Sequence, residues 1–189
     1  MNATAQRLLS GMFVLAVCVA SATADSPTDG NQTSEIDQLA SALSSVEIDE
    51  RRDAAYALAK LGPDALPAID ALIKGLGDRD DQVWMQSAMA VARIGPQAEP
   101  AIDALVRSLG DDDEQRRYRS AWALSRIGTA TIEALVAAAE DDSTRRRIAA
   151  LDAMGWMAAD ADRLLESLDN AVRDQNPDVR RQATASLSR

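Results

Sequence analysis

The sequence contains no histidine, and its one cysteine is Cys18. Without histidine, neither a serine–histidine–aspartate triad nor a histidine-bound metal site can form. With one cysteine, no disulfide within the chain is possible. The remaining residues offer no nucleophile beside a base, no cluster of metal ligands and no phosphate-binding loop. The sequence therefore predicts a protein that is not an enzyme and that holds neither a metal nor a cofactor.

Basic residues are outnumbered by acidic ones. The chain has 20 Lys and Arg against 30 Asp and Glu, which gives a formal net charge of −10. Nucleic acids and anionic membrane surfaces attract basic proteins and repel such an excess of carboxylates. We therefore expect neither as a partner, while a basic or neutral protein partner remains open.

Residues 1–24 have the composition of an export signal. Arg7 provides the positive start, a mostly apolar stretch covers residues 8–20, and Ala22-Thr23-Ala24 matches a signal-peptidase site. That stretch is too short to span a bilayer. We expect export to the periplasm or the cell exterior without membrane attachment. A lipid anchor at Cys18, preceded by an unusually large Val17, and an uncleaved segment are the open alternatives.

The rest of the chain divides into a linker and a repeat domain. Residues 25–33 are polar, contain proline and glycine, and are predicted to be a linker. Within residues 34–189 the phrases that end at Gly62, Gly95 and Gly128 recur with a step of 33 residues. Apolar residues follow helical spacing throughout this part, and no alternating strand pattern occurs. These features predict an all-α solenoid built from copies of one unit.

Each copy of the unit is predicted to contain two helices. Good N-cap residues precede the first helix of successive copies at Asp80, Asp113, Ser143 and Asn176. The buried stripe of that helix is represented by Val83, Ser87, Ala90, Val91 and Ile94. The glycine that follows permits a left-handed turn, and Pro63 or Pro96 then discourages the helix from continuing. The stripe of the second helix is represented by Leu66, Ile69, Leu72, Ile73 and Leu76, and in the fourth copy by Leu165 and Leu168.

Half-units are expected at both ends of the array. Ile36, Leu39 and Leu43 match a second helix without its first, and residues 177–189 match a first helix without its second. Such half-units shield the apolar faces at the ends of a stack. The predicted architecture is an α-solenoid of about four helix pairs between two half-repeats.

The repeated phrase resembles the short bacterial HEAT repeat. That phrase has Asp, a short gap, Val-Arg, and then an Ala-rich helix that ends in Ile-Gly; residues 78–95 and 174–187 resemble it, with Val179-Arg180 as the best match. The resemblance implies first helices on the convex side and second helices on the concave side. Most such families are scaffolds, but the resemblance extends to phycobilin lyases and to deoxyhypusine hydroxylase. The lack of histidine excludes the metal site of the hydroxylase, and the export signal argues against an intracellular lyase.

Two rows of residues are candidate partner-binding sites. An acid stands at one position of four successive second helices, at Asp70, Asp103, Glu133 and Glu166. These acids either pair between repeats, with the series Arg51, Arg117, Arg147 and Arg180 or with neighbouring polar groups, or form a negative row that receives a cationic or polar partner. In the first helices, Tyr56, Met89 and Trp122 share a position that either packs between helices or forms an exposed apolar ridge.

Two further features have a structural and a functional interpretation. Trp84 stands where the family usually has Arg, and it either packs at the edge of the core or contacts a partner. The acidic runs at residues 78–81, 111–114 and 140–142 suggest calcium, but they recur where acids cap helices, and the glycine of an EF-hand loop is missing. Capping is the favoured interpretation.

The sequence as a whole predicts an exported, non-enzymatic scaffold or adaptor that binds another protein. The alternative is a lyase-like or chaperone-like assistant that loads a prosthetic group onto a partner protein.

Overall fold

The computed structural model describes residues 29–157 and 161–189. The expected export signal, with Cys18, lies outside these residues. The architecture below is that of the unit Gln32–Arg189. Helix α2 spans Asp29–Ala42. It therefore begins inside the segment expected to be a linker, because a run of polar residues that starts with Asp is compatible with a first helical turn.

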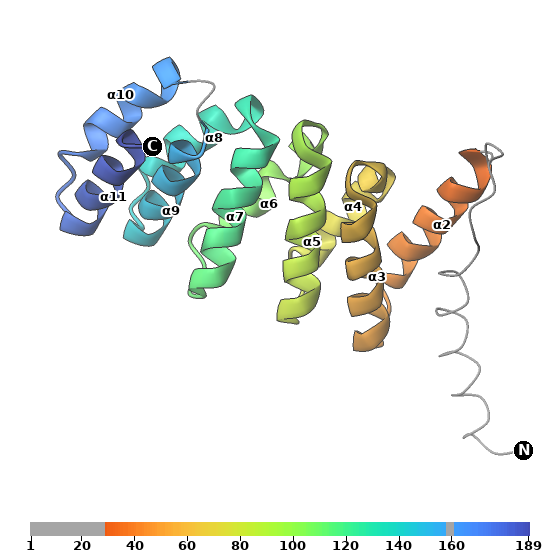
Figure 1. Cartoon of the computed structure of the whole chain (residues 1–189). Coiled ribbons are helices and arrows are strands. Elements are labelled where there is room, and N and C mark those ends of the chain that lie inside the picture. Colours follow the sequence, from red (N-terminus) through yellow and green to blue (C-terminus); the bar gives the residue numbers. More distant parts are fainter. Residues whose placement is uncertain (1–28, 158–160) are drawn as a thin grey trace, which may run out of the picture. The chain divides into compact units, whose positions relative to one another are not determined.

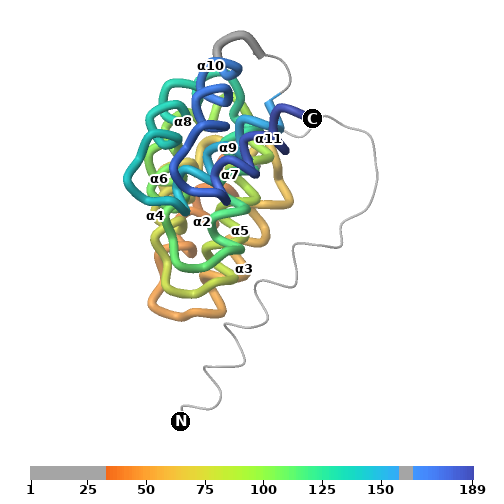
Figure 2. Tube along the Cα trace, turned by 90° about the vertical axis from the view of Figure 1, so that its left-hand side faces the viewer, coloured from red at the N-terminus to blue at the C-terminus, as the bar shows by residue number. Residues whose placement is uncertain are grey.

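The Gln32–Arg189 unit is a stack of helix pairs in two layers. One layer holds the first helices α3 (Ile48–Leu61), α5 (Asp81–Ile94), α7 (Glu114–Ile127), α9 (Thr144–Gly155) and α11 (Pro177–Leu187). Each of them packs against the next (Figure 1). The other layer holds α4 (Ile69–Gly75), α6 (Ile102–Ser108), α8 (Ile132–Ala139) and α10 (Ala161–Ala171). Figure 2 shows the two layers side by side, with α4, α6 and α8 in one and α3, α5 and α7 in the other.

This arrangement confirms the predicted fold class. The described helices form four pairs, α3 with α4, α5 with α6, α7 with α8 and α9 with α10, while α2 and α11 stand as half-repeats. None of the described helices combines the length and the apolar character needed to cross a membrane.

The predicted caps are present at the start of the first helices. The Asp80 carboxylate accepts hydrogen bonds from the amides of Gln82 and Val83. Asp113 caps α7 in the same way, while Ser143 accepts from the Arg146 amide of α9 and Asn176 accepts from the Asp178 amide of α11. These bonds satisfy amides that the helix itself leaves without acceptors. They confirm capping by an acid for the runs at residues 78–81 and 111–114, whereas beside residues 140–142 the cap is Ser143.

A glycine turn follows each of the first three complete first helices. Gly62, Gly95 and Gly128 have φ values of 61°, 73° and 86°. Positive φ was expected, but ψ lies between −126° and −141°, outside the left-handed helical region and in one that only glycine adopts readily. Short 3₁₀ segments follow, at Gly62–Ala68, Gly95–Ala101 and Thr129–Thr131. The shorter third segment accounts for the shortened third repeat.

The core lies between the layers and follows the predicted stripes with one correction. Val83, Ala90 and Val91 are fully buried, as is Leu72 of the second-helix stripe. In α10, however, Leu165 is 43% exposed, whereas Leu164 and Leu168 are buried. The prediction for Leu165 was wrong because two adjacent leucines fit the pattern equally well. Residues 164 and 168, one helical turn apart, are the pair that faces the core.

Candidate functional site

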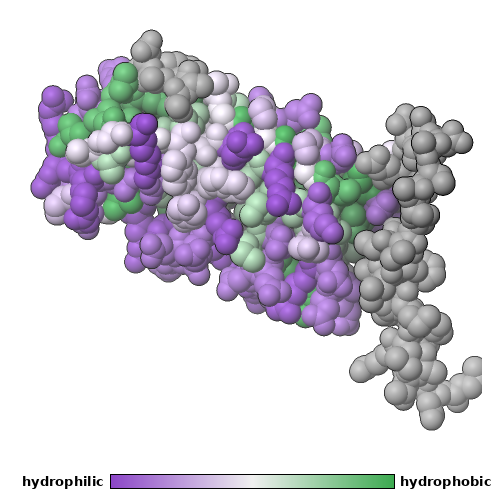
Figure 3. Space-filling view, in the orientation of Figure 1, coloured by the Kyte–Doolittle hydropathy of each residue, from purple (hydrophilic) through white to green (hydrophobic). Residues whose placement is uncertain are grey.

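The loops that join the repeats are held by a recurring arginine. Arg51, Arg117, Arg147 and Arg180 each donate from Nη1 to two consecutive backbone carbonyls of the preceding loop, at 2.7–3.3 Å. Figure 3 shows hydrophilic residues along the lower edge of the molecular face in view, over the starts of α3, α5 and α7. The junctions are therefore rich in polar groups.

Two of these arginines also join neighbouring repeats. Arg51 binds the carboxylate of Asp78 in a bidentate pair, with Nε–Oδ2 at 2.8 Å and Nη2–Oδ1 at 3.3 Å. Arg147 binds Asp174 in the same way. Burial alone would raise the pKa of each carboxyl, but the arginine and a loop amide lower the pKa of both below the ordinary value. Ion pairs between repeats therefore exist, but their carboxylates come from the loops that join the repeats.

The acids of the second helices do not take part in these ion pairs between repeats. Asp70, Asp103 and Glu166 are exposed, and within the described residues their side chains form no hydrogen bond or ion pair. Glu133, at the same position of α8, is exposed as well. The expected pairing of these acids with the arginine series is therefore wrong for Asp70, Asp103 and Glu166. The junction carbonyls and aspartates lie within the reach of the arginines and occupy them.

The row extends to a fifth acid, Asp37, which was not predicted from the sequence. Asp37 of α2 follows the buried Ile36 as Asp70 follows Ile69, and it too is exposed. The signal was available, because Ile36 and Ile69 stand seven residues before Leu43 and Leu76. We call Asp37, Asp70, Asp103, Glu133 and Glu166 the acid row.

Partly exposed apolar residues lie beside the acid row. Ile73, Val106 and Val136 stand three residues after the acids of α4, α6 and α8, on the same side of each helix, and all three are half-buried. Lys74 and Arg107 follow them and are exposed. We call this side of the second helices the second-helix face. It offers exposed carboxylates, apolar surface and two cations.

The residues of the expected ridge do not form one continuous exposed surface. Tyr56 is 54% exposed, with the Lys60 ammonium 5.6 Å from its ring centroid. Met89 and Trp122 are half-buried against the core, as the packing interpretation requires. At the matching position of α9, Asp152 accepts a hydrogen bond from Gln182. Burial raises the pKa of the Asp152 carboxyl.

A pair of aromatic side chains, Tyr118 and Trp156, was not identified from the sequence. Tyr118 of α7 is 54% exposed and meets Trp156 edge to face, with 5.3 Å between the ring centroids. The guanidinium carbon of Arg189 lies 5.4 Å from the ring centroid of Trp156. The two aromatic residues occupy different repeat positions, so comparison of equivalent positions does not pair them.

Trp84 packs inside the structure. Its side chain is 1% exposed, and the guanidinium carbon of Arg116 lies 5.2 Å from its ring centroid. Arg116 donates to the Asp81 carboxylate at 2.6 Å and to the Asp78 carbonyl at 3.4 Å. Arg116 thus reaches one of the carbonyls that the missing arginine would bind. The indole Nε1 of Trp84 has no acceptor among the described residues.

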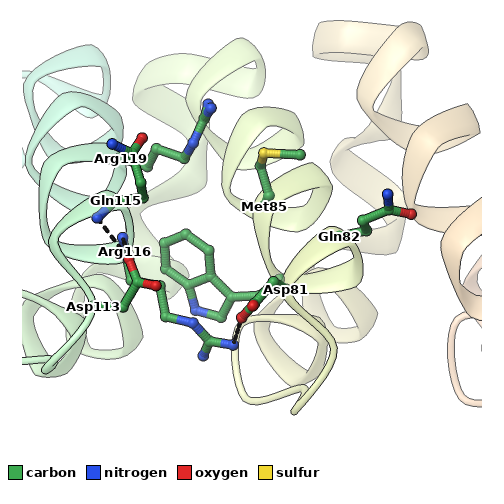
Figure 4. Close-up of a pocket in the computed structure, with 8 residues that line it drawn as sticks. Asp81, Gln82, Met85, Asp113, Gln115, Arg116 and Arg119 are labelled. Carbon is green, nitrogen blue, oxygen red and sulfur yellow. Dashed lines mark hydrogen bonds and ion pairs between the residues drawn. The ribbon is translucent and has the colours of Figure 1, made fainter.

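A cavity of about 230 Å³ lies beside Trp84. Trp84 and Met85 of α5 form its apolar wall, and Gln115, Arg116 and Arg119 of α7 line the opposite side. Figure 4 shows Met85 and Arg119 on opposite sides of this space, and the Asp81–Arg116 pair at another end of it. We call this space the Trp84 cavity.

The junction acids act as caps and loop acceptors. Asp78, Asp111, Asp141 and Asp174 each accept a hydrogen bond from the amide two residues further on. In the part of the chain that the structure describes, no three His, Cys, Asp or Glu side chains are grouped as metal ligands.

Comparisons with known proteins agree with this architecture. The sequence profile of the family described as HEAT repeats matches residues 36–125 and 116–188. No curated protein sequence matches the chain. A designed armadillo repeat protein in complex with the peptide (KR)4 is similar in structure, with a TM-score of 0.58 and 20% identity over 99% of this chain and 95% of that one.

Two further solved structures are similar. The archaeal HEAT-like repeats protein from Thermococcus onnurineus NA1 has a TM-score of 0.58 and 13% identity, over 82% of this chain and 70% of that one. A computationally designed armadillo repeat protein for modular peptide recognition has a TM-score of 0.53 and 20% identity, over 81% of each chain. At such low identity, these likenesses concern the fold.

Proposed function

The chain belongs to the HEAT-repeat family, and from this premise we propose that it is an exported, non-enzymatic adaptor that binds a basic segment of a partner protein. A repeat solenoid is suited to protein binding because its stacked units present one extended surface. The second-helix face is the surface that this proposal assigns to the partner. Export rests on the composition of residues 1–24, and N-terminal sequencing of the secreted protein tests it.

The observation that carries the proposal is the exposure of the acid row. Asp70, Asp103 and Glu166 are engaged by no cation among the described residues, whereas the junction aspartates Asp78 and Asp174 are held by arginines. A regular row of exposed carboxylates is complementary to a segment with several Lys or Arg side chains. The half-buried Ile73, Val106 and Val136 offer apolar surface to the stems of such side chains.

The energetics require several contacts at once. One exposed ion pair contributes only about 0.2–1 kcal/mol, so a single lysine would bind weakly. A segment that spans several repeats combines these contributions, and the electrostatic attraction also speeds its encounter with the protein. A protein with a similar fold was solved in complex with the basic peptide (KR)4, which makes this peptide a suitable probe.

The proposal is tested with fluorescently labelled (KR)4 and with neutral (QS)4 of the same length. We expect anisotropy to show binding of (KR)4 only, about three- to tenfold weaker in the double variant Asp70→Asn/Asp103→Asn. The matched control is Asp53→Asn/Glu114→Gln, which removes two exposed carboxylates from the first-helix layer. An equal loss in both double variants would show that net charge, and not the acid row, attracts the peptide.

A further inference from the structure

Trp84 replaces a residue that the fold uses four times. At the equivalent position, Arg51, Arg117, Arg147 and Arg180 each bind two loop carbonyls. At Trp84 the indole is buried and its Nε1–H has no acceptor among the described residues. A buried donor without an acceptor is unfavourable and requires an explanation. Local rules of this kind are commonly broken where a protein binds something.

The Trp84 cavity has room for a small ring. Its volume of about 230 Å³ exceeds the roughly 150 Å³ that suffices for benzene in a protein interior. Met85 is half-buried and supplies a thioether that contacts flat apolar groups favourably, whereas Trp84 is 1% exposed and offers only the part of its ring that lines the cavity. The wall from α5 is therefore suited to an aromatic or similar flat body.

Two carboxylates, Asp81 and Asp113, and two guanidinium groups, Arg116 and Arg119, line the cavity. Arg116 is occupied by Asp81, at 2.6 Å. The Asp113 carboxylate accepts from the amides of Gln115 and Arg116. Arg119 lines the cavity, is half-buried, and has no hydrogen bond or ion pair among the described residues. A guanidinium in such a setting favours a carboxylate, which it binds with two parallel hydrogen bonds.

We propose that the Trp84 cavity binds an aromatic carboxylate, with the ring against Trp84 and Met85 and the carboxylate on Arg119. This site lies between α5 and α7 and is separate from the acid row. The ligand is either a small molecule or the C-terminal residue of a protein, since a C-terminal phenylalanine carries the same two groups.

The test follows the indole N–H signals in ¹H–¹⁵N spectra, with the Trp84 signal assigned by Trp84→Phe. Phenylacetate is expected to shift the Trp84 signal, and its neutral amide to do so much more weakly. Arg119→Gln should weaken phenylacetate binding about tenfold, the loss of one charge-assisted interaction. Arg126→Gln is the matched control, because Arg126 is an exposed arginine of the same helix that does not line the cavity. This variant should bind phenylacetate as tightly as the wild type does.

Peptides distinguish the two sources of the ligand. Acetyl-Gly-Gly-Phe with a free carboxylate is compared with its C-terminal amide. Stronger binding of the free acid than of phenylacetate indicates a protein C-terminus, and the reverse indicates a small molecule. If neither acid shifts the Trp84 signal, or if the amides bind as well as the acids, the proposal is overturned.

Trp84→Arg provides a second test that does not depend on Arg119. The variant would place an arginine at position 84 beside Arg116. It should fold, because Arg117 and Arg146 occupy the two equivalent positions at the next junction. The variant is expected to retain a cooperative melting transition and to lose binding of phenylacetate. Retained binding in this folded variant would overturn the proposal.

Discussion

Arg51 of one repeat binds Asp78 of the next through two hydrogen bonds, and both side chains are largely buried, at 20% and 14% exposure. Arg147 and Asp174 form the same pair three junctions further on, at 14% and 17%. These pairs connect successive repeats, so the solenoid is held together by charge at its edge as well as by its apolar core.

Removal of Arg51 should weaken the stack. We expect Arg51→Ala to lower the free energy of unfolding in urea by about 1–3 kcal/mol, because Asp78 is left partly buried without its cation. Arg181→Ala is the matched control, since its pair with Asp178 is exposed at 76% and 54%, and it should cost less than about 0.5 kcal/mol. A double-mutant cycle of Arg51 and Asp78 that shows no coupling energy would contradict this account.

The caps, the stripes and the fold class were predictable from the sequence, because each depends on local spacing. Asp80 and Asp113 stand one position before a helical pattern, and that position alone defines an N-cap. The pairing of Arg51 with Asp78 was not predictable in this way. A long side chain reaches several acids, and the stacking distance between repeats decides which one it binds.

The environment of Trp84 also depends on the third dimension. The sequence shows that a tryptophan replaces an arginine, but only the structure places Arg116 over its ring and a cavity beside it.

The need for glycine at position 75 was likewise not predictable from the sequence. A Cβ at this position would lie 2.2 Å from Ser87 Oγ, a contact between helices that no pattern around Gly75 indicates.

Gly62 tests the turn between the two helices of a repeat. A Cβ there meets nothing within 4 Å, so the cost of Gly62→Ala comes from the backbone at φ 61° and ψ −126° alone. We expect a loss of about 1–3 kcal/mol in the free energy of unfolding. Unchanged stability would mean that the turn relaxes to another conformation.

The pair of Arg52 and Asp80 predicts a dependence on pH. Hydrogen bonds from Arg52 lower the pKa of Asp80 to about 2, from an ordinary value of 3.8. The folded state then binds protons less readily than the unfolded state, so this contribution to stability is fully present above about pH 4 and is lost as pH falls towards 2.

The measurement is the difference in unfolding free energy between the wild type and Arg52→Met. We expect this difference to be constant above about pH 4 and to shrink as pH falls to about 2. Arg145→Met is the control, because the Asp112 carboxylate that it leaves is 94% exposed. A difference that does not change with pH would contradict the assigned role of Asp80.

The two ends of the expected ridge should respond differently to truncation. Trp122 packs against the core, so we expect Trp122→Ala to lower the unfolding free energy by about 2–4 kcal/mol. Tyr56 is mostly exposed, and Tyr56→Ala should cost less than about 1 kcal/mol. Thermal melts of the two variants suffice, and equal losses would show that Tyr56 also packs in solution.

The central claim is that the second-helix face binds a basic segment of a partner. Its most direct test is a ¹H–¹⁵N chemical-shift map of the protein titrated with (KR)4. The account predicts the largest shifts at Asp70, Ile73, Asp103 and Val106, along α4 and α6, with a steep loss of binding as salt is added. Shifts confined to the junction loops or to α3, α5 and α7, or no shifts at all, would contradict it.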